Sequence, residues 1–205
     1  TSQLTILGLM AGILFLMAYT PLGYLNIGPL AVTFNVIPVA VCAIVLGPTG
    51  GAIAGAVFGL TSFMQAIGIG GVSALGSALF QINPFMTAVQ CFGPRILDGI
   101  CIGFIYRAVH KKANTYVSCA VTGFFSAFLN TLFFMTALIV MFGNTELIRN
   151  LMGGHNIIVG CCLMVGVNAI SEMVSSTIIT AAVGTALSKA HLIPAVQIVK
   201  TDTAA

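Results

Sequence analysis

The first part of the chain, from Thr1 to Pro94, contains no side chain that carries a formal charge. Arg95 and Asp98 then follow, inside a segment that is otherwise apolar enough to cross a bilayer. On a helix their spacing puts both side chains on one face. An ionisable group at membrane depth costs at least about 2.5–3.5 kcal/mol on insertion scales, so it normally faces a protein interior or a wet cavity. A functional site is therefore expected around this pair.

The composition is that of an integral membrane protein. Of the 205 residues, 59% are hydrophobic and 5% are charged, whereas a soluble domain carries about 25% charged residues. The net charge of +3 is small and scattered, which excludes a nucleic-acid-binding surface. The six cysteines form no CxxC pair, so we expect buried free thiols and neither a metal site nor a cofactor.

The fold class predicted is all-α, a compact bundle of six transmembrane helices with a long outer loop between the third and the fourth. Pro38 is expected to kink the second helix, and residues 47–51 to form a tight reversal before the third. Residues 67–84 are too polar and rich in glycine to be a confident span, and a long loop of this kind is often a lid. The predicted helices are residues 3–20, 30–46, 51–66, 85–109, 116–142 and 157–187.

The basic cluster after the fourth helix predicts the orientation. Arg107, Lys111 and Lys112 should be cytoplasmic by the positive-inside rule, and six crossings then put both termini in the cytoplasm. The first apolar run lacks a basic n-region and a cleavage pattern, so it is predicted to be a transmembrane helix and not a signal peptide. Residues 1–190 are expected to form one domain, and residues 191–205 a disordered tail.

Polar side chains of the last three helices are expected to share one depth. At about 1.5 Å per residue, Arg95, Asn130 and Asn168 lie roughly 15, 18 and 16 Å from the outer side. Asp98 and Glu172 lie a turn deeper, as candidate ion-pair partners of Arg95. The planar fork of arginine suits a carboxylate, and the amides suit amide or hydroxyl groups. Three further side chains could close this pocket from above: Gln65, Gln81 and Asn83.

A purely structural explanation of the same residues is also open. Arg95 could form an ion pair with Asp98 or Glu172 and bind nothing. Asn130 and Asn168 are of the type that makes hydrogen bonds between transmembrane helices. We favour the binding site because intramembrane charges mark function by default.

The order of helices and two motifs carry a family resemblance. Residues 46–55 (Leu-Gly-Pro-Thr-Gly-Gly-Ala-Ile-Ala-Gly) form a Gly-Pro reversal into a glycine-rich helix, and Gly8 and Gly12 form a small-xxx-small pattern in the first helix. With six helices and the long outer loop, the chain resembles the substrate-binding S components of energy-coupling factor (ECF) vitamin transporters. In that family the first-helix pattern, usually made of alanines, contacts the coupling subunit.

The resemblance implies a subunit of the bacterial cytoplasmic membrane that captures a vitamin from outside, while a coupling subunit and two cytosolic ATPases supply the energy. The chain has no GxxxxGK[ST] motif of its own. The pantothenate branch is the best match, because one midplane arginine beside amides suits a slim molecule with a carboxylate, an amide and hydroxyls. Riboflavin is the alternative, and biotin, niacin and lipoate also carry carboxylates. A membrane enzyme and a self-sufficient secondary transporter are disfavoured, because no nucleophile–base constellation and no internal repeat is evident.

Overall fold

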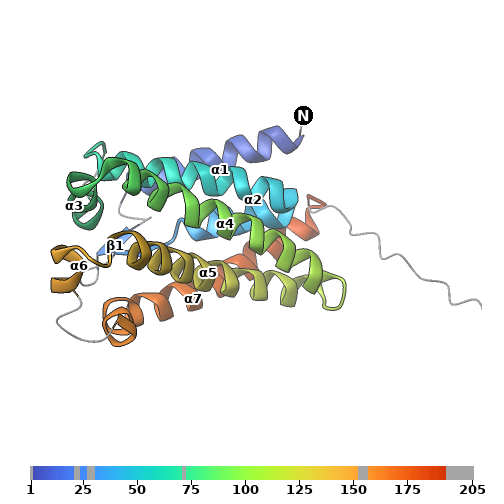
Figure 1. Cartoon of the computed structure of the whole chain (residues 1–205). Coiled ribbons are helices and arrows are strands. Elements are labelled where there is room, and N and C mark those ends of the chain that lie inside the picture. Colours follow the sequence, from blue (N-terminus) through green and yellow to red (C-terminus); the bar gives the residue numbers. More distant parts are fainter. Residues whose placement is uncertain (1, 21–23, 27–30, 71–72, 152–156, 193–205) are drawn as a thin grey trace, which may run out of the picture.

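The computed structural model describes the whole chain except residues 1, 21–23, 27–30, 71–72, 152–156 and 193–205. The long helices lie side by side, and the short helices α3 and α6 lie together at one end of the bundle (Figure 1). Two short strands, β1 (Tyr24–Asn26) and β2 (Ala31–Thr33), pair antiparallel. The helices are α1 (Ser2–Ala18), α2 (Val36–Ala66), α3 (Ala74–Ile82), α4 (Pro84–His110), α5 (Thr115–Phe142), α6 (Glu146–Leu151) and α7 (Ile157–Lys189).

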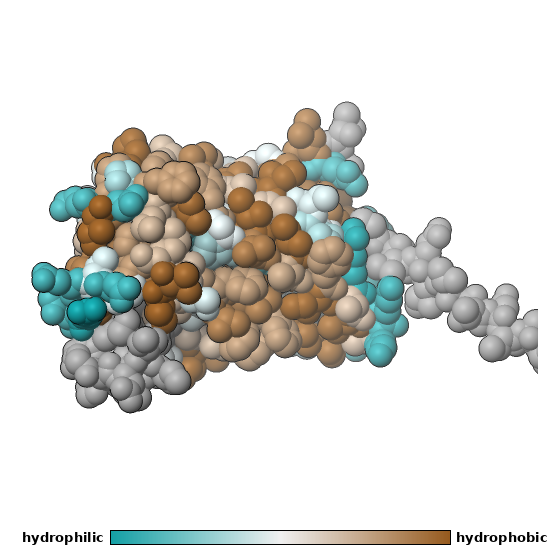
Figure 2. Space-filling model, viewed as in Figure 1, coloured by the Kyte–Doolittle hydropathy of each residue, from teal (hydrophilic) through white to brown (hydrophobic). Residues whose placement is uncertain are grey.

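The flank of the bundle is apolar and exposed, as expected for a protein in a bilayer. In the described residues, α2, α4, α5 and residues 168–189 of α7 are long and apolar enough to cross a membrane. Large side chains such as Phe104, Val140 and Ile170 are exposed on this flank. Hydrophilic residues gather at the two ends of the molecule, with a largely hydrophobic surface between them (Figure 2). Apart from the short strand pair, the chain is therefore a helical, multi-pass type of membrane protein.

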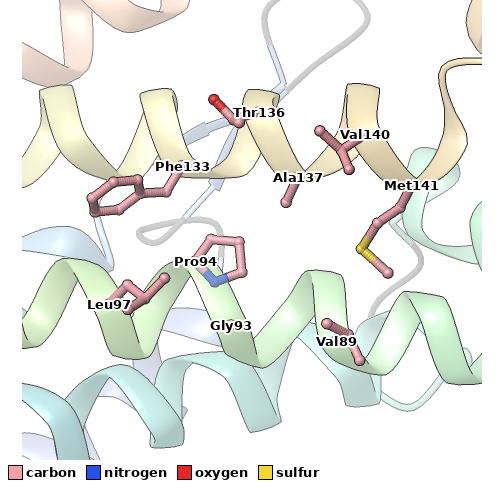
Figure 3. Close-up of a pocket in the computed structure, with 9 residues that line it drawn as sticks. All are labelled: Val89, Gly93, Pro94, Leu97, Phe133, Thr136, Ala137, Val140 and Met141. Atoms are coloured by element: carbon pink, nitrogen blue, oxygen red, sulfur yellow. The ribbon is translucent and has the colours of Figure 1, made fainter.

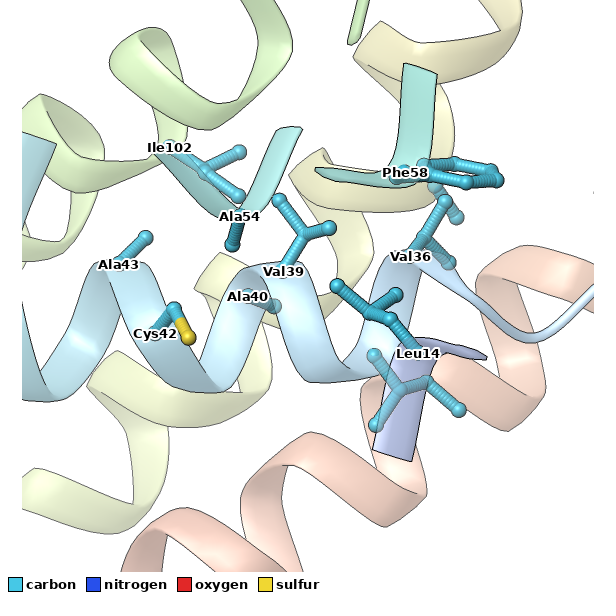
Figure 4. Close-up of a cluster of buried hydrophobic side chains, with 11 residues drawn as sticks. Leu14, Val36, Val39, Ala40, Cys42, Ala43, Ala54, Phe58 and Ile102 are labelled. Atoms are coloured by element: carbon cyan, nitrogen blue, oxygen red, sulfur yellow. The ribbon is translucent and has the colours of Figure 1, made fainter. Parts of the chain in front are cut away.

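Helix α2 is a hairpin of two helical halves. The break is Gly47, with φ 74° and ψ −164°, a conformation that favours glycine. A Cβ atom on Gly51 would lie 3.0 Å from the Cβ of Ala43, whereas eight residues of straight helix would separate them by about 12 Å. Val36 of the first half and Phe58 of the second share one buried core (Figure 4). The predicted reversal at residues 47–51 is confirmed.

Two expectations about the start of this hairpin are wrong. The predicted helix over residues 30–46 begins only at Val36, because Ala31–Thr33 pair with β1 instead. Pro38 lies in the first turn of α2, where its missing N–H costs no helical hydrogen bond, so it causes no break there. The chain reverses at Gly47 alone among the residues of α2.

The predicted outer loop 67–84 contains a helix. Ser73 accepts a hydrogen bond from the Gly76 N–H and caps α3, and Leu79 buries its side chain against the outer part of α5. Residues 143–156, also expected to be a loop, contain α6, whose Ile148 joins the same cluster. Both segments look like polar loops in the sequence because only one side of each short helix is apolar. Of the predicted tail, residues 193–205 lie outside the described part of the chain.

The glycine row of α2 packs against the backbone of α4. A Cβ atom on Gly51, Gly55 or Gly59 would overlap a main-chain atom of α4. Small residues therefore let the two helices approach closely, and the row serves packing inside the molecule. The contacts join Gly51 to Gly99, Gly55 to Arg95, and Gly59 to Cys91.

Candidate functional site

Arg95 lies on the part of α4 that packs against the glycine row of α2. Its guanidinium carbon lies 4.5 Å from the centroid of the Phe58 ring and 5.6 Å from that of Phe134. A cation over an aromatic face is attracted by the ring quadrupole, more strongly where water is excluded. The two rings, one from α2 and one from α5, therefore hold the arginine head inside the bundle.

The hydrogen bonds of Arg95 leave part of its head available. Nη1 donates to the main-chain oxygens of Cys91 at 3.0 Å and Gln90 at 3.4 Å. Gln90 O is available because Pro94, four residues later, has no N–H to donate to it. The buried Nε has no hydrogen-bond partner among the described residues. A buried charged donor left unpaired is costly, which makes this nitrogen a candidate to bind an anionic ligand.

The two buried carboxylates are not hydrogen-bonded to Arg95 in the described structure. Asp98 is 2% exposed, and its Oδ1 has no partner there. Glu172, on α7, accepts a hydrogen bond of 2.6 Å at Oε1 from the main-chain N–H of Thr33. Both carboxylates remain candidates for a supporting role around the arginine.

The junction between β2 and α2 lies among the helices that supply these groups. Thr33 bonds to Glu172 of α7, and the carbonyl of Val36 accepts a hydrogen bond of 3.3 Å from Ser126 of α5. Val36 also belongs to the core that contains Phe58, the ring next to Arg95. Residues 33–36 therefore connect α2, α5 and α7 close to the arginine.

The two predicted asparagines are buried on the helices that face this junction. Asn130 is 7% exposed and lies one turn beyond Ser126 on α5. Phe134, whose ring faces Arg95, is one further turn along the same face. Asn168 is 5% exposed and precedes Glu172 by one turn of α7. Asn130 and Asn168 are thus buried in the bundle, where the side chain of Arg95 is half-buried.

The three outer candidates have separate local environments. Gln65 is buried, and its Nε2 donates at 2.7 Å to the carbonyl of Ala18 at the end of α1. Asn83 caps α4 by accepting hydrogen bonds from the N–H groups of Phe85 and Met86. Gln81 is exposed on α3. The structure gives none of the three a contact with Arg95.

An apolar groove lies between α4 and α5 (Figure 3). Its volume is about 350 Å³. Its walls come from α4 and α5, and several of its side chains are among the exposed apolar residues of the flank. Its lining offers almost no polar surface, so it is not the site expected for a polar solute. Its lining is Val89, Gly93, Pro94, Leu97, Phe133, Thr136, Ala137, Val140 and Met141.

Comparison with known proteins identifies the family of the chain. The model of the family described as "ECF transporter, substrate-specific component" matches residues 2–184. The chain belongs to this family. It is 33% identical over 178 residues to a protein named pantothenate transporter PanT from Leuconostoc mesenteroides, covering 83% of this chain and 81% of the relative. It is 28% identical over 203 residues to one named pantothenic acid transporter PanT from Lactococcus lactis, covering 93% and 95%.

As a substrate-specific component of an ECF transporter, the chain needs a surface for other subunits as well as a solute site. Gly8 and Gly12 are exposed on α1, and a Cβ atom added to either would meet no atom within 4 Å. They therefore differ from Gly51, Gly55 and Gly59, which pack inside the molecule. This face of α1 is free for a close helix contact in the described structure.

Sequence reasoning missed or undervalued several residues of this S component. Gln90 is not among the expected site residues, yet it is 1% exposed, donates from Nε2 to Phe134 O at 2.9 Å, and has an unpartnered Oε1 in the described chain. Phe58 and Phe134 were not singled out, because phenylalanine is common in apolar helices. Asn35 lay inside a predicted helix. Only its burial in the folded chain distinguishes it from an interfacial residue.

Proposed function

We propose that this chain is the pantothenate-specific S component of an ECF importer. It binds the vitamin from the outside and passes it inward with a membrane-embedded coupling subunit and two cytosolic ATPase subunits. The observation that carries the proposal is the interior arginine head of Arg95, held by two rings and with an unpartnered Nε. Two relatives named as pantothenate transporters support the choice of solute.

The chemistry of pantothenate suits these groups. It is a slim molecule with a carboxylate at one end, a central amide, and hydroxyl groups at the other end. Arg95 binds the carboxylate through charge-assisted hydrogen bonds, and the amides of Asn130 and Asn168 bind the neutral part. Asp98 and Glu172 help to balance the charge of Arg95 and do not contact the solute, because a second anion beside the solute carboxylate would repel it.

The outer candidates control entry to the site in this proposal. Gln65, Gln81 and Asn83 line the way in from the end of the molecule at which α3 and α6 lie. The hairpin of α2 counts as two crossings, which with α1, α4, α5 and α7 makes six. Lys111 and Lys112 at the opposite end are then cytoplasmic, together with both termini. Reaction of Lys112→Cys with a membrane-impermeant thiol reagent in intact cells would contradict this orientation.

The test of the function is a binding titration of the purified chain with pantothenate and with riboflavin. We expect pantothenate alone to bind tightly. Arg95→Ala should weaken pantothenate binding roughly ten- to a hundredfold, since hydrogen bonds to charged groups contribute about 1.5–3 kcal/mol. The affinity for pantothenol, in which an alcohol replaces the carboxylate, should change little.

Arg149→Ala is the matched control, because Arg149 is an exposed arginine on α6 with its charge in water. Its affinity for pantothenate should equal that of the wild type. Tight riboflavin binding, or an unchanged affinity in Arg95→Ala, would refute the proposal.

A further inference from the structure

Asn35 is a buried amide whose side chain has no hydrogen-bonding partner in the part of the chain that the structure describes. It is 0% exposed, and neither Nδ2 nor Oδ1 has a partner among the described residues. Burying an amide without compensation is destabilising, and nearly all buried side-chain polar groups in proteins are paired. An unpaired donor and acceptor on one side chain therefore suggest a binding function.

The position of Asn35 would normally explain it as a helix cap, but it does not act as one. Helices α2, α4 and α5 each follow directly after an asparagine that the structure describes. Asn83 and Asn114 accept hydrogen bonds from the first turn of their helices, as capping residues do. Asn35 has helical angles (φ −64°, ψ −15°) and makes no side-chain cap hydrogen bond in the described chain. Its amide thus serves neither the helix nor a described neighbour.

Its surroundings connect Asn35 to the arginine site. Its main-chain N–H lies 3.4 Å from the hydroxyl oxygen of Thr33, the residue that bonds to Glu172. The next residue, Val36, accepts a hydrogen bond from Ser126 and shares a core with Phe58, over which Arg95 lies. The residues on both sides of Asn35 thereby contact α5 and α7, and Val36 packs in the core that contains the ring next to Arg95.

We propose that Asn35 is a solute-binding residue that recognises the hydroxyl next to the amide carbonyl of the solute. This inference rests on the proposed function. A carboxamide presents one donor and one acceptor side by side. An α-hydroxy amide offers the complement, a carbonyl that accepts from Nδ2 and a hydroxyl that donates to Oδ1. Arg95 then fixes the charged end of the solute and Asn35 the neutral end.

The experiment uses two variants and two analogues of pantothenate. The first analogue has hydrogen in place of the hydroxyl next to the amide carbonyl, and the second is pantothenol. We expect the wild type to bind pantothenate roughly ten- to a hundredfold more tightly than the deoxy analogue, since a site built around a hydroxyl is left with unpaired groups without it. Asn35→Leu should lose this preference while it keeps the preference for pantothenate over pantothenol.

The thermal stability of the unliganded chain distinguishes binding from a structural role. Leucine has nearly the shape of asparagine and no polar atoms, so Asn35→Leu should raise the melting temperature by removing two unpaired groups. Asn114→Leu is the matched control: it removes an amide that does cap a helix, so it should lower the melting temperature and leave both preferences unchanged.

Three results would contradict either the binding role of Asn35 or the proposed function. If the wild type binds pantothenate but Asn35→Leu weakens pantothenate and the deoxy analogue equally, the inference is wrong and the proposed function stands. A lower melting temperature for Asn35→Leu would likewise make Asn35 a structural residue. If the wild type does not bind pantothenate at all, the proposed function itself fails.

Discussion

Arg95 is held on one side by two carbonyls of its own helix and on the other by rings from two neighbouring helices. This arrangement fixes the plane of the guanidinium without a hydrogen bond to a carboxylate in the described chain. A lysine at this position would keep the charge but lose the planar stacking and the forked geometry. The environment of the residue thus selects arginine in particular.

At the same scale, Pro94 is predicted to position the arginine. In Pro94→Ala the new N–H would donate to Gln90 O. This is a carbonyl to which Arg95 Nη1 donates in the wild type, so the two donors would compete for it. The unliganded chain should become about 1–3 kcal/mol more stable, because proline in a helix interior is unfavourable. Pantothenate affinity should nevertheless fall several-fold, because Arg95 loses one of its two anchors.

Thermal unfolding and a binding titration on the same preparation measure both effects of Pro94→Ala. Pro84→Ala, at the first residue of α4, is the control, because proline there costs no helical hydrogen bond. A rise in stability with unchanged affinity would mean that the orientation of Arg95 does not depend on Pro94.

The contact between α2 and α4 connects helix packing to the site. The two halves of the α2 hairpin pack around a shared core. The glycines of the second half contact the α4 backbone at Cys91, Arg95 and Gly99. Close approach of the two backbones brings Phe58 under the arginine head. The geometry of the site is therefore set by the interface between these elements.

Gly55→Leu is predicted to disrupt this interface. The new side chain would overlap the carbonyl of Arg95, and overpacking of this kind costs about 1–3 kcal/mol or more. The melting temperature of the purified chain and its affinity for pantothenate should both fall. Gly8→Leu makes the same chemical change where a Cβ meets nothing within 4 Å, so both quantities should stay at their wild-type values. Equal melting temperatures for the two variants would contradict the packing argument.

For the whole molecule, the proposed solute site and the proposed partner surface lie on different elements. The arginine is enclosed by α2, α4 and α5, whereas α1 contacts α2 and exposes its glycines. Substitutions on α1 can therefore affect assembly without affecting capture of the solute.

Gly12→Leu is predicted to separate these two activities. A leucine would keep another helix from approaching α1 closely, so pantothenate uptake by vesicles that contain the coupling subunit and the ATPases should fall at least tenfold. Pantothenate binding to the isolated chain should be unchanged. Exposed Leu9→Ala on the same helix is the control, since it enlarges no side chain. Normal uptake by Gly12→Leu would exclude this face as the coupling contact.

The long helices were predictable from the sequence to within a few residues. Residues 85–109 and 116–142 were expected to be helical, and α4 and α5 span Pro84–His110 and Thr115–Phe142. The short helices α3 and α6 and the strand pair were not predicted. Their apolar side chains are few, and their structure depends on contacts such as that of Leu79 with the outer part of α5. A local pattern carries little information about such segments.

The membrane class, the main helices and the choice of Arg95 as a candidate site residue follow from the order of residues alone. In a bilayer every backbone polar group must be satisfied internally, so a long apolar run has few alternatives to a helix, and a charge within it needs a reason. The partner of each polar group could be identified only in the folded molecule. Arg95 faces Phe58 and Phe134 and has no carboxylate bonded to it in the described chain, while Asn35 is buried without a partner. These relations join residues far apart in the chain, and only the packing of the helices brings them into contact.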